Sequence, residues 1–242
     1  MNRFYCRSGD VSGETIIISD PGQLHHLKDV LRFKAGDKAE IFDDKANEFS
    51  VVLTGISDKQ AEFSVKERKP AGIRRSRLAI ACALPKRSKI DDIIDKLTQL
   101  GVDRIIPLAT ERVIVRIDKD KALARQKRWE AIALSASKQS KRNNVPVVDP
   151  LTDFGDLIAN SREFELKLIP NLEGEREGLK KLLAGKKPSS VLVLIGPEGD
   201  FTPDEVRAAK KSGFIPVSFG DFVLRVETAA LFAASVLNYE IG

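Results

Sequence analysis

The chain has 242 residues, of which 42% are hydrophobic and 31% charged, a balance typical of a folded globular protein. Its 40 Lys and Arg residues outnumber the 35 Asp and Glu residues, and the net charge of +5 favours a polyanionic partner. No stretch approaches the roughly 20 apolar residues of a membrane-spanning helix, and the N-terminus has no apolar leader. A cytoplasmic protein with no membrane contact is therefore expected.

Several kinds of site find little support in the residue types. The two cysteines, Cys6 and Cys82, are too few and too far apart for a disulfide framework or a metal cluster, and no metal is expected. The two histidines are adjacent, at His25 and His26, which argues against a Ser-His-Asp or metal-hydrolase site. The glycine-rich phosphate and dinucleotide loops of nucleotide-binding enzymes are missing from the sequence.

The first part of the chain has the pattern of a small β-rich domain. Four short runs rich in β-branched and aromatic residues are predicted as strands: 14–19, 38–42, 48–56 and 60–67. Turn signals such as Pro21-Gly22 separate the runs, and a short helical segment is expected over 25–32. These features predict a small antiparallel β-barrel over residues 1–70.

From residue 76 onward, apolar runs alternate with helical patterns. The predicted strands are 78–84, 104–108, 165–169, 191–195 and 215–219. The predicted helices are 90–100, 120–140, 178–183 and 203–212, with a further alanine-rich helix at the end of the chain. This alternation predicts an α/β domain over residues 71–242, with a mainly parallel sheet covered by helices.

The loop after the strand run 191–195 is the most informative segment. Gly196-Pro197-Glu198-Gly199 ends the run abruptly, and Thr202-Pro203-Asp204-Glu205 then has the pattern of a helix start. Thr202 is the predicted N-cap, and Glu205 is placed to complete a capping box. Ligands of open α/β sheets bind outside the carboxyl ends of the strands, which makes this loop a candidate site. Any strand–turn–helix unit can also be built in this way, so the loop is either a ligand-binding site or an ordinary connection.

Short motifs stand in the order typical of one protein family. They are HHLKDVLR at 25–32, KLTQLGV at 96–102, QSKR at 139–142, LIGPEGDF at 194–201 and LRVETAA at 224–230. On these motifs the whole chain resembles the ribosomal RNA small-subunit methyltransferase E family. The resemblance implies a PUA-like RNA-binding β-barrel at 1–70 and a SPOUT-type α/β domain with a C-terminal trefoil knot at 71–242. It also implies a homodimer that uses S-adenosylmethionine to methylate N3 of a uridine in 16S ribosomal RNA of the small ribosomal subunit.

The resemblance also implies the residues of the site. The methyl donor would contact Leu194, Gly196, Glu198, Gly199, Phe219, Gly220, Leu224, Glu227, Thr228 and Ala229. Arg225 would stabilise the developing uracil anion or fix a phosphate, with Glu227 or Glu198 as proton acceptor. Arg142 would act near the pocket across the dimer. RNA phosphates would be contacted by Arg32, Lys86 and Lys96.

The chain departs from the family pattern at a few positions. Gln99 and Lys138 stand where acidic residues are usual, and Asp200 stands where glycine is common. Asp221 and Phe222, before Leu224, leave open the exact shape of the donor pocket that the resemblance implies. Two alternative functions remain: a SPOUT methyltransferase acting on another RNA, such as 23S or transfer RNA, and a non-enzymatic RNA-binding or ribosome assembly factor. Mapping of the methylated RNA distinguishes the first alternative from methylation of 16S ribosomal RNA. Measurable binding of the methyl donor distinguishes an enzyme from the second alternative.

Overall fold

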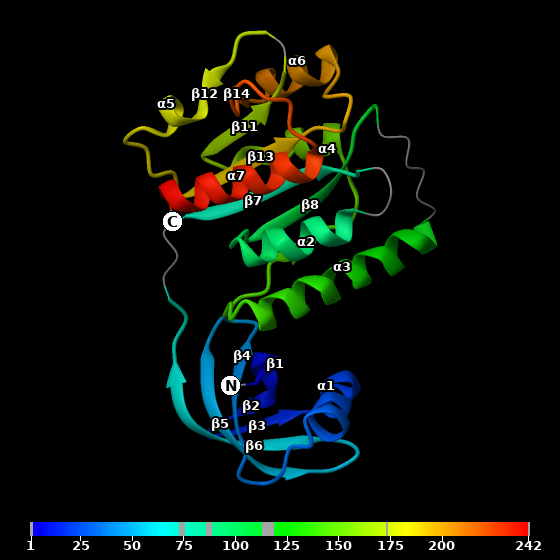
Figure 1. Ribbon diagram of the computed structural model, residues 1–242, viewed down its shortest axis with the longest axis vertical. Coiled ribbons are helices and arrows are strands. Elements are labelled where there is room, and N and C mark those ends of the chain that lie inside the picture. The colour runs from blue at the N-terminus through cyan, green and yellow to red at the C-terminus, as the bar shows by residue number, and fades with distance from the viewer. Residues whose placement is uncertain (1, 73–75, 86–88, 113–118, 173, 242) are drawn as a thin grey trace. The chain divides into compact units, whose positions relative to one another are not determined.

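The computed structural model describes residues 2–72, 76–85, 89–112, 119–172 and 174–241 (Figure 1). The chain divides into two compact units, each with its own sheet. The first comprises Met1–Ile73 and Ser137–Val145, and the second comprises Arg74–Ala136 and Pro146–Gly242. Within the described ranges, every helix is too short or too polar to cross a membrane.

The sheet of the first unit, as far as the structure describes it, has six strands that curl into a half-barrel in the order β1-β4-β5-β6-β3-β2. Their bounds are β1 Arg3–Cys6, β2 Val11–Ser12, β3 Thr15–Ile18, β4 Lys38–Asp43, β5 Glu48–Ile56 and β6 Ala61–Lys69. The prediction of a purely antiparallel barrel is wrong at one place, because β1 pairs with β4 in parallel. Parallel neighbours need a long connection, and the chain between these two strands is long enough to provide it.

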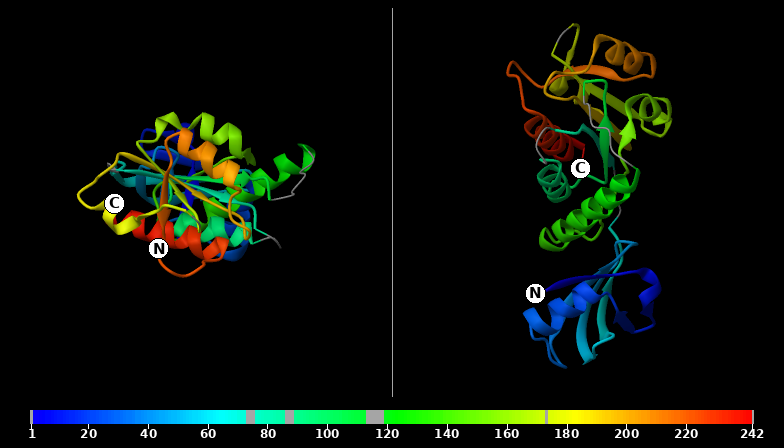
Figure 2. Two further views of the ribbon diagram at one scale, coloured as in Figure 1. Left: turned by 90° about the horizontal axis from the view of Figure 1, so that it is seen from above. Right: turned by 90° about the vertical axis from the view of Figure 1, so that its right-hand side faces the viewer.

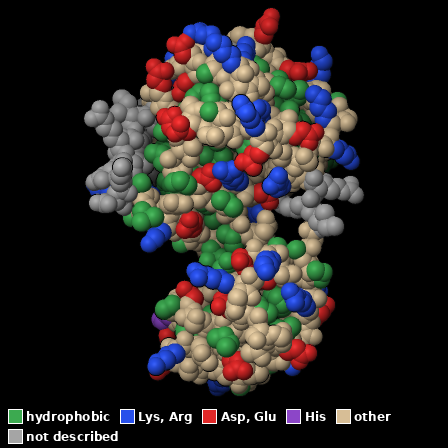
Figure 3. All heavy atoms as spheres, turned by 180° about the vertical axis from the view of Figure 1, so that it is seen from behind, with side chains coloured by type: hydrophobic (Ala, Val, Ile, Leu, Met, Phe, Trp, Pro, Cys, Tyr) green, Lys and Arg blue, Asp and Glu red, His purple; other side chains and the backbone are tan. Residues whose placement is uncertain are grey.

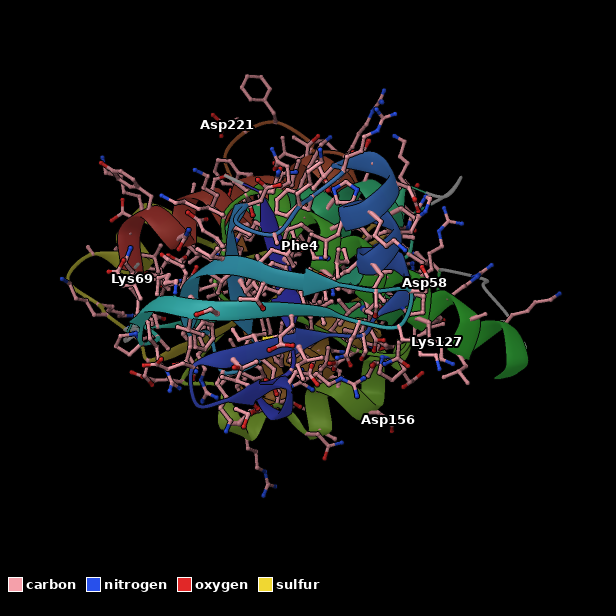
Figure 4. All side chains as sticks on the ribbon, turned by 90° about the horizontal axis from the view of Figure 1, so that it is seen from below. Phe4, Asp58, Lys69, Lys127, Asp156 and Asp221 are labelled. Carbon is pink, nitrogen blue, oxygen red and sulfur yellow. The ribbon has the colours of Figure 1, made fainter. Side chains whose placement is uncertain are left out.

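Alternating side chains fill the interior of the half-barrel. In β5, Phe49, Val51 and Leu53 are buried while their neighbours are half-buried or exposed, which is the period-2 pattern of a strand with one face on a core. Phe4, from β1, is also buried and lies among the strands (Figure 4). Leu27 closes this core from the helical segment.

The helical segment begins earlier than predicted. Helix α1 spans Pro21–His25 and continues into a π-helical turn over His26–Val30. The Asp20 side chain caps α1 by accepting a hydrogen bond from the Gln23 amide, and Pro21 occupies the first turn. Pro21-Gly22 is therefore a helix start and not the turn that the sequence suggested.

Polar contacts hold the segment Ser137–Val145 to the half-barrel. The side chain of Arg3 is only 5% exposed and donates to Glu48 Oε2 at 3.2 Å and to the carbonyl oxygen of Arg142 at 3.1 Å. Lys138 Nζ donates to Gln23 Oε1 at 3.0 Å, and burial lowers the pKa of Lys138. Residues at the end of a helix in the sequence-predicted α/β domain thus pack as part of the first unit.

The second unit contains the predicted parallel sheet. Its strands are β7 Arg77–Ala83, β8 Arg104–Ala109, β9 Val147–Val148, β10 Thr152–Asp153, β11 Leu166–Pro170, β12 Glu177–Gly178, β13 Ser190–Ile195 and β14 Ile215–Ser218. Their spatial order is β10-β8-β7-β13-β11-β14-β12, with β9 beside β8. All strand pairs found in the described part of this sheet are parallel, which confirms the prediction.

Helices cover both faces of the parallel sheet (Figure 2). They are α2 Ile90–Gln99, α3 Lys119–Gln139, α4 Phe154–Ala159, α5 Leu179–Leu183, α6 Pro203–Lys211 and α7 Val226–Ile241. Helices α4 and α6 pack on one face around Phe154, Phe201 and Leu194. Helix α7 packs against β7, β13 and α2 on the other. The trefoil knot stays a prediction.

The start of helix α6 agrees with the prediction in detail. Thr202 is the N-cap, its hydroxyl accepts from the Glu205 amide, and a Glu205 carboxylate oxygen accepts from the Thr202 amide at 2.8 Å. The helix ends before Gly213, which has φ +85°. The capping box fixes the point at which the chain leaves the loop after β13.

Candidate functional site

A pocket opens at the carboxyl edge of the parallel sheet. The loops that follow β11, β13 and β14 line it, together with the first turn of α7. These strands are neighbours in the order β13-β11-β14, and because they are parallel their carboxyl ends lie at the same edge. This edge is where open α/β sheets bind ligands. The sequence predicted the loop after β13 as a candidate site for the same reason.

The β13–α6 loop is held in shape by close packing and by buried hydrogen bonds. A Cβ on Gly196 would lie 3.1 Å from the ring of Phe201, so a larger residue would require that ring to shift by a few tenths of an ångström. The Glu205 carboxylate, which is buried, also accepts from the Glu111 amide at 2.9 Å. Arg112 donates to the carbonyl oxygen of Gly199. The loop is therefore fixed to the segment that follows β8.

The β14–α7 loop forms another wall of the pocket. Gly220 has φ +113°, a backbone conformation that residues with a Cβ rarely adopt. The ring of Phe219 packs on Phe232 of α7, with 5.1 Å between their centroids. Phe222 also lines the pocket and is 84% exposed, while Asp221 lies on the outer side of the loop (Figure 4).

Charged side chains cluster at the start of α7. The carbonyl oxygen of Arg225 accepts the hydrogen bond from the Ala229 amide, so the exposed Arg225 side chain stands at the first turn. Lys89 Nζ donates to Glu227 Oε1 at 2.5 Å. This hydrogen bond, with the charge of Arg225 as a smaller contribution, holds the pKa of Glu227 below its usual value. Glu227 is thus an ionised carboxylate at a helix N-terminus, where negative charge is favourable.

The Lys89–Glu227 pair predicts a pH-dependent contribution to stability. The pKa of Glu227 is lower in the folded than in the unfolded chain. The stabilisation is therefore present above the ordinary glutamate pKa and is lost as the pH falls through the folded value.

At neutral pH, Glu227→Gln should lower the free energy of unfolding by about 0.5–1 kcal/mol, because a partly exposed ion pair of this kind is lost. Denaturant unfolding of both proteins between neutral and acid pH measures the difference, with Glu240→Gln at the far end of α7 as control. A difference that persists unchanged in acid would contradict this account.

The structure gathers most of the predicted donor-contacting residues at one place. Those that line the pocket are Gly196, Glu198, Phe219, Gly220, Leu224 and Ala229. Gly199, Glu227 and Thr228 are next to lining residues in the chain. The Leu194 side chain is instead buried in the core between the sheet and helices α4 and α6.

The other predicted site residues lie elsewhere. Arg142 belongs to the first unit, where its guanidinium donates to Asn144 Oδ1 at 3.2 Å. Arg32, also in the first unit, is exposed and has φ +54°. Lys96 is exposed on α2 and pairs with Asp92 at 2.8 Å. Lys86 falls outside the described residues.

Sequence reasoning missed the contribution of the β11 loop. Asn171, Leu172 and Arg176 line the pocket, and all follow the end of β11 at Pro170. The same carboxyl-edge rule that selected the loop after β13 could have selected this one, because 165–169 was already a predicted strand. Lys89, the hydrogen-bond partner of Glu227, is also absent from the residues predicted for the site.

The pocket combines an apolar wall with a few polar groups. Ile195, Val217 and Leu224 supply hydrophobic surface, while Glu198 and Arg176 supply opposite charges. Such a lining suits an organic ligand with an apolar body and polar ends. Among the residues that the structure describes, no group of three or more His, Cys, Asp or Glu side chains is placed to hold a metal ion.

Comparisons with known proteins define the class to which this fold and pocket belong. Residues 74–238 match a model described as an RNA methyltransferase domain. Residues 18–66 match a model described as an RNA methyltransferase PUA domain. The protein is therefore an RNA methyltransferase with an N-terminal PUA domain.

Individual relatives narrow this class. The chain is 30% identical over 227 residues to ribosomal RNA small subunit methyltransferase E of Bacillus subtilis, covering 90% of this chain and 88% of that protein. A protein of the same name from Neisseria gonorrhoeae has been solved bound to S-adenosyl methionine. Its structure matches this one with a TM-score of 0.86 and 29% sequence identity, and the match covers 99% of this chain and 97% of that chain. A Legionella pneumophila methyltransferase solved with bound SAM has a TM-score of 0.87 and 29% identity, covering 98% and 96%. The chain belongs to the ribosomal RNA small subunit methyltransferase E family.

Proposed function

We propose that the protein transfers the methyl group of S-adenosylmethionine to N3 of a uridine in 16S ribosomal RNA of the small ribosomal subunit. The observation that carries this proposal is the pocket at the carboxyl edge of the sheet, whose lining residues all lie within the matched RNA methyltransferase domain. Relatives that cover most of this chain are named for the small-subunit reaction, and two solved relatives hold the methyl donor. The proposed setting is the cytoplasm.

The residues of the pocket fit the methyl donor. The apolar wall suits the adenine ring, and the loops around Gly196 and Gly220 present backbone groups that could bond the ring and the ribose. The proposed donor-contacting set is Leu194, Gly196, Glu198, Gly199, Phe219, Gly220, Leu224, Glu227, Thr228 and Ala229. Leu194 would act through its backbone, because its side chain is in the core. When bound, the donor supplies a methyl group on a sulfonium leaving group.

Catalysis would rest on positioning the uracil and on removing its N3 proton. Arg225, which is exposed at the first turn of α7, would stabilise negative charge on the uracil or fix a phosphate. Glu198, which lines the pocket, is the better candidate for proton acceptor. Glu227 accepts a hydrogen bond from Lys89, and its lowered pKa makes it a weaker base. The role of Glu227 would therefore be to neutralise positive charge beside Arg225.

We further propose that the enzyme is a homodimer in which Arg142 of one protomer reaches the pocket of the other. Helix α7 leaves Phe232 37% and Tyr239 88% exposed, which supplies apolar surface for association. The segment that carries Arg142 is fastened to the half-barrel through Arg3 and Lys138. A fixed segment of this kind would present the arginine in a defined geometry.

RNA binding would combine the PUA domain with basic residues of the α/β domain. Arg32, Lys86 and Lys96 are the proposed phosphate contacts. Basic and acidic side chains are intermixed on the face shown in Figure 3, so net charge alone does not mark the footprint. Individual contacts must then be tested by their effect on the salt dependence of binding.

RNA affinity is expected to fall steeply as salt rises, with a log–log slope of about −0.7 to −0.9 per phosphate contact. Arg32→Ala and Lys96→Ala should each reduce that slope by about one and weaken binding to all RNAs alike. Fluorescence anisotropy across a salt series measures the slope. Lys127→Ala, on the exposed surface of α3, is the control and should leave it unchanged. A wild-type affinity that does not change with salt would contradict this electrostatic account.

Labelled S-adenosylmethionine tests the proposed reaction. Purified protein is incubated with 30S subunits lacking the modification, and parallel reactions contain 50S subunits or transfer RNA. Incorporation into the 30S subunits alone supports the proposal. Incorporation into another RNA would reassign the substrate, and failure to bind the donor at all would favour an RNA-binding assembly factor.

A further inference from the structure

Asp200 has an unusual backbone conformation at the edge of the pocket. It lines the pocket from the β13–α6 loop and has φ +60°, in the left-handed region that favours glycine. An aspartate in this region carries a conformational cost that glycine would avoid. A side chain retained at such a cost needs a compensating interaction.

The Asp200 carboxylate provides two such interactions. Its Oδ1 accepts a hydrogen bond from the Phe201 amide at 2.8 Å, within its own loop. Its Oδ2 accepts one from the Leu172 amide, also at 2.8 Å, in the loop that follows β11. Both Leu172 and Asp200 line the pocket. One carboxylate thus connects two of the three loops from which the pocket is built.

The backbone at Gly199 and Asp200 is also held by Arg112, from the segment after β8. Arg112 donates to the carbonyl oxygens of Gly199 and Asp200, the second at 3.4 Å. Asp200 Oδ1 also lies 3.3 Å from the position that a Cβ on Gly196 would occupy. The backbone of the loop is therefore fixed by the segment after β8, whereas the hydrogen bond to the Leu172 amide of the β11 loop is made by the Asp200 side chain.

We infer that Asp200 is a positioning residue for the methyl donor, joining the β11 loop to the β13–α6 loop and thereby setting donor affinity. This inference rests on the proposed function of the pocket. Glycine would satisfy the backbone but could not accept from the Leu172 amide. The carboxylate preorganises the two loops before the ligand arrives, which reduces the ordering that binding must accomplish.

Two variants separate the carboxylate from the backbone conformation. Asp200→Gly removes both acceptors and relieves the positive φ, so the melting temperature should stay close to that of the wild type. The dissociation constant for S-adenosylmethionine, measured by calorimetry on the full-length protein, should rise about tenfold. Turnover at saturating donor should be retained. Asp200→Asn keeps one acceptor and tolerates the left-handed region, so its effect should be smaller.

The control is Asp204→Asn, which changes an exposed carboxylate on α6 that pairs with Arg207. This variant should bind the donor as tightly as the wild type. If Asp200→Gly binds the donor as tightly as the wild type, the inference is wrong and the proposed function still stands. A fall in turnover with unchanged donor affinity would also overturn it. If the wild type itself does not bind the donor, the proposed function fails first.

Discussion

Replacing Arg225 by Ala is expected to lower the rate of methyl transfer by a factor of about 10²–10³, the effect of removing one group that stabilises developing charge. The dissociation constant for the methyl donor should change by less than about threefold. Arg225 is an exposed side chain at the first turn of α7 and is outside the lining of the pocket. Single-turnover methylation of 30S subunits and calorimetric donor titration measure the two quantities separately.

A second arginine variant tests what the guanidinium contributes. Arg225→Lys keeps the positive charge but loses the planar fork that bonds a carbonyl or phosphate through two N–H groups. It should therefore remain strongly impaired. Arg207→Ala, an exposed arginine on α6 paired with Asp204, is the matched control. A large loss of donor binding in Arg225→Ala would show that the residue serves the donor and not the uracil.

Replacing Gly220 by Ala is expected to weaken donor binding by about tenfold to a hundredfold. The φ of +113° at this position is strongly unfavourable for alanine, at a cost on the order of 1–3 kcal/mol. The loop should relieve that strain by moving, and it forms a wall of the pocket. Donor titration of the variant measures the loss of affinity.

Gly185→Ala is the matched control for this variant. Gly185 also has positive φ, +69°, but it follows α5 and does not line the pocket. Its replacement should lower the melting temperature and leave the donor affinity unchanged. If the two variants lose donor affinity equally, general destabilisation and not the shape of the β14–α7 loop would be responsible.

Elements governed by local chemistry could be predicted well from the sequence. Strand β5 has the bounds predicted for it, 48–56, because alternation of buried and exposed residues is a local property. The Thr202–Glu205 capping box formed as predicted because its partners are three residues apart. The parallel sheet followed from the alternation of strand and helix patterns.

Features that depend on non-local pairing could not be predicted in the same way. The parallel pairing of β1 with β4 joins segments separated by α1 and two strands. The β11 loop enters the pocket because β11 lies between β13 and β14 in the sheet, although it precedes both in the chain. No local pattern encodes that order.

The electrostatic interactions of the site also depend on residues that are far apart in the chain, so they could not be predicted from the sequence. Lys89 and Glu227 are 138 residues apart in the chain, yet their hydrogen bond sets the pKa of the carboxylate. The family resemblance identified Glu227 as important but could not assign its partner. The Asp200 carboxylate likewise accepts from the Leu172 amide, in a loop that no local sequence pattern links to Asp200.

Mass mapping of 16S ribosomal RNA tests the central claim most directly. The protein is incubated with 30S subunits lacking the modification and with S-adenosylmethionine carrying a labelled methyl group, and the RNA is then digested and sequenced by mass spectrometry. The proposal predicts one new methyl group, at N3 of a single uridine. A methyl group on another base or another atom, or none despite donor binding, would contradict it.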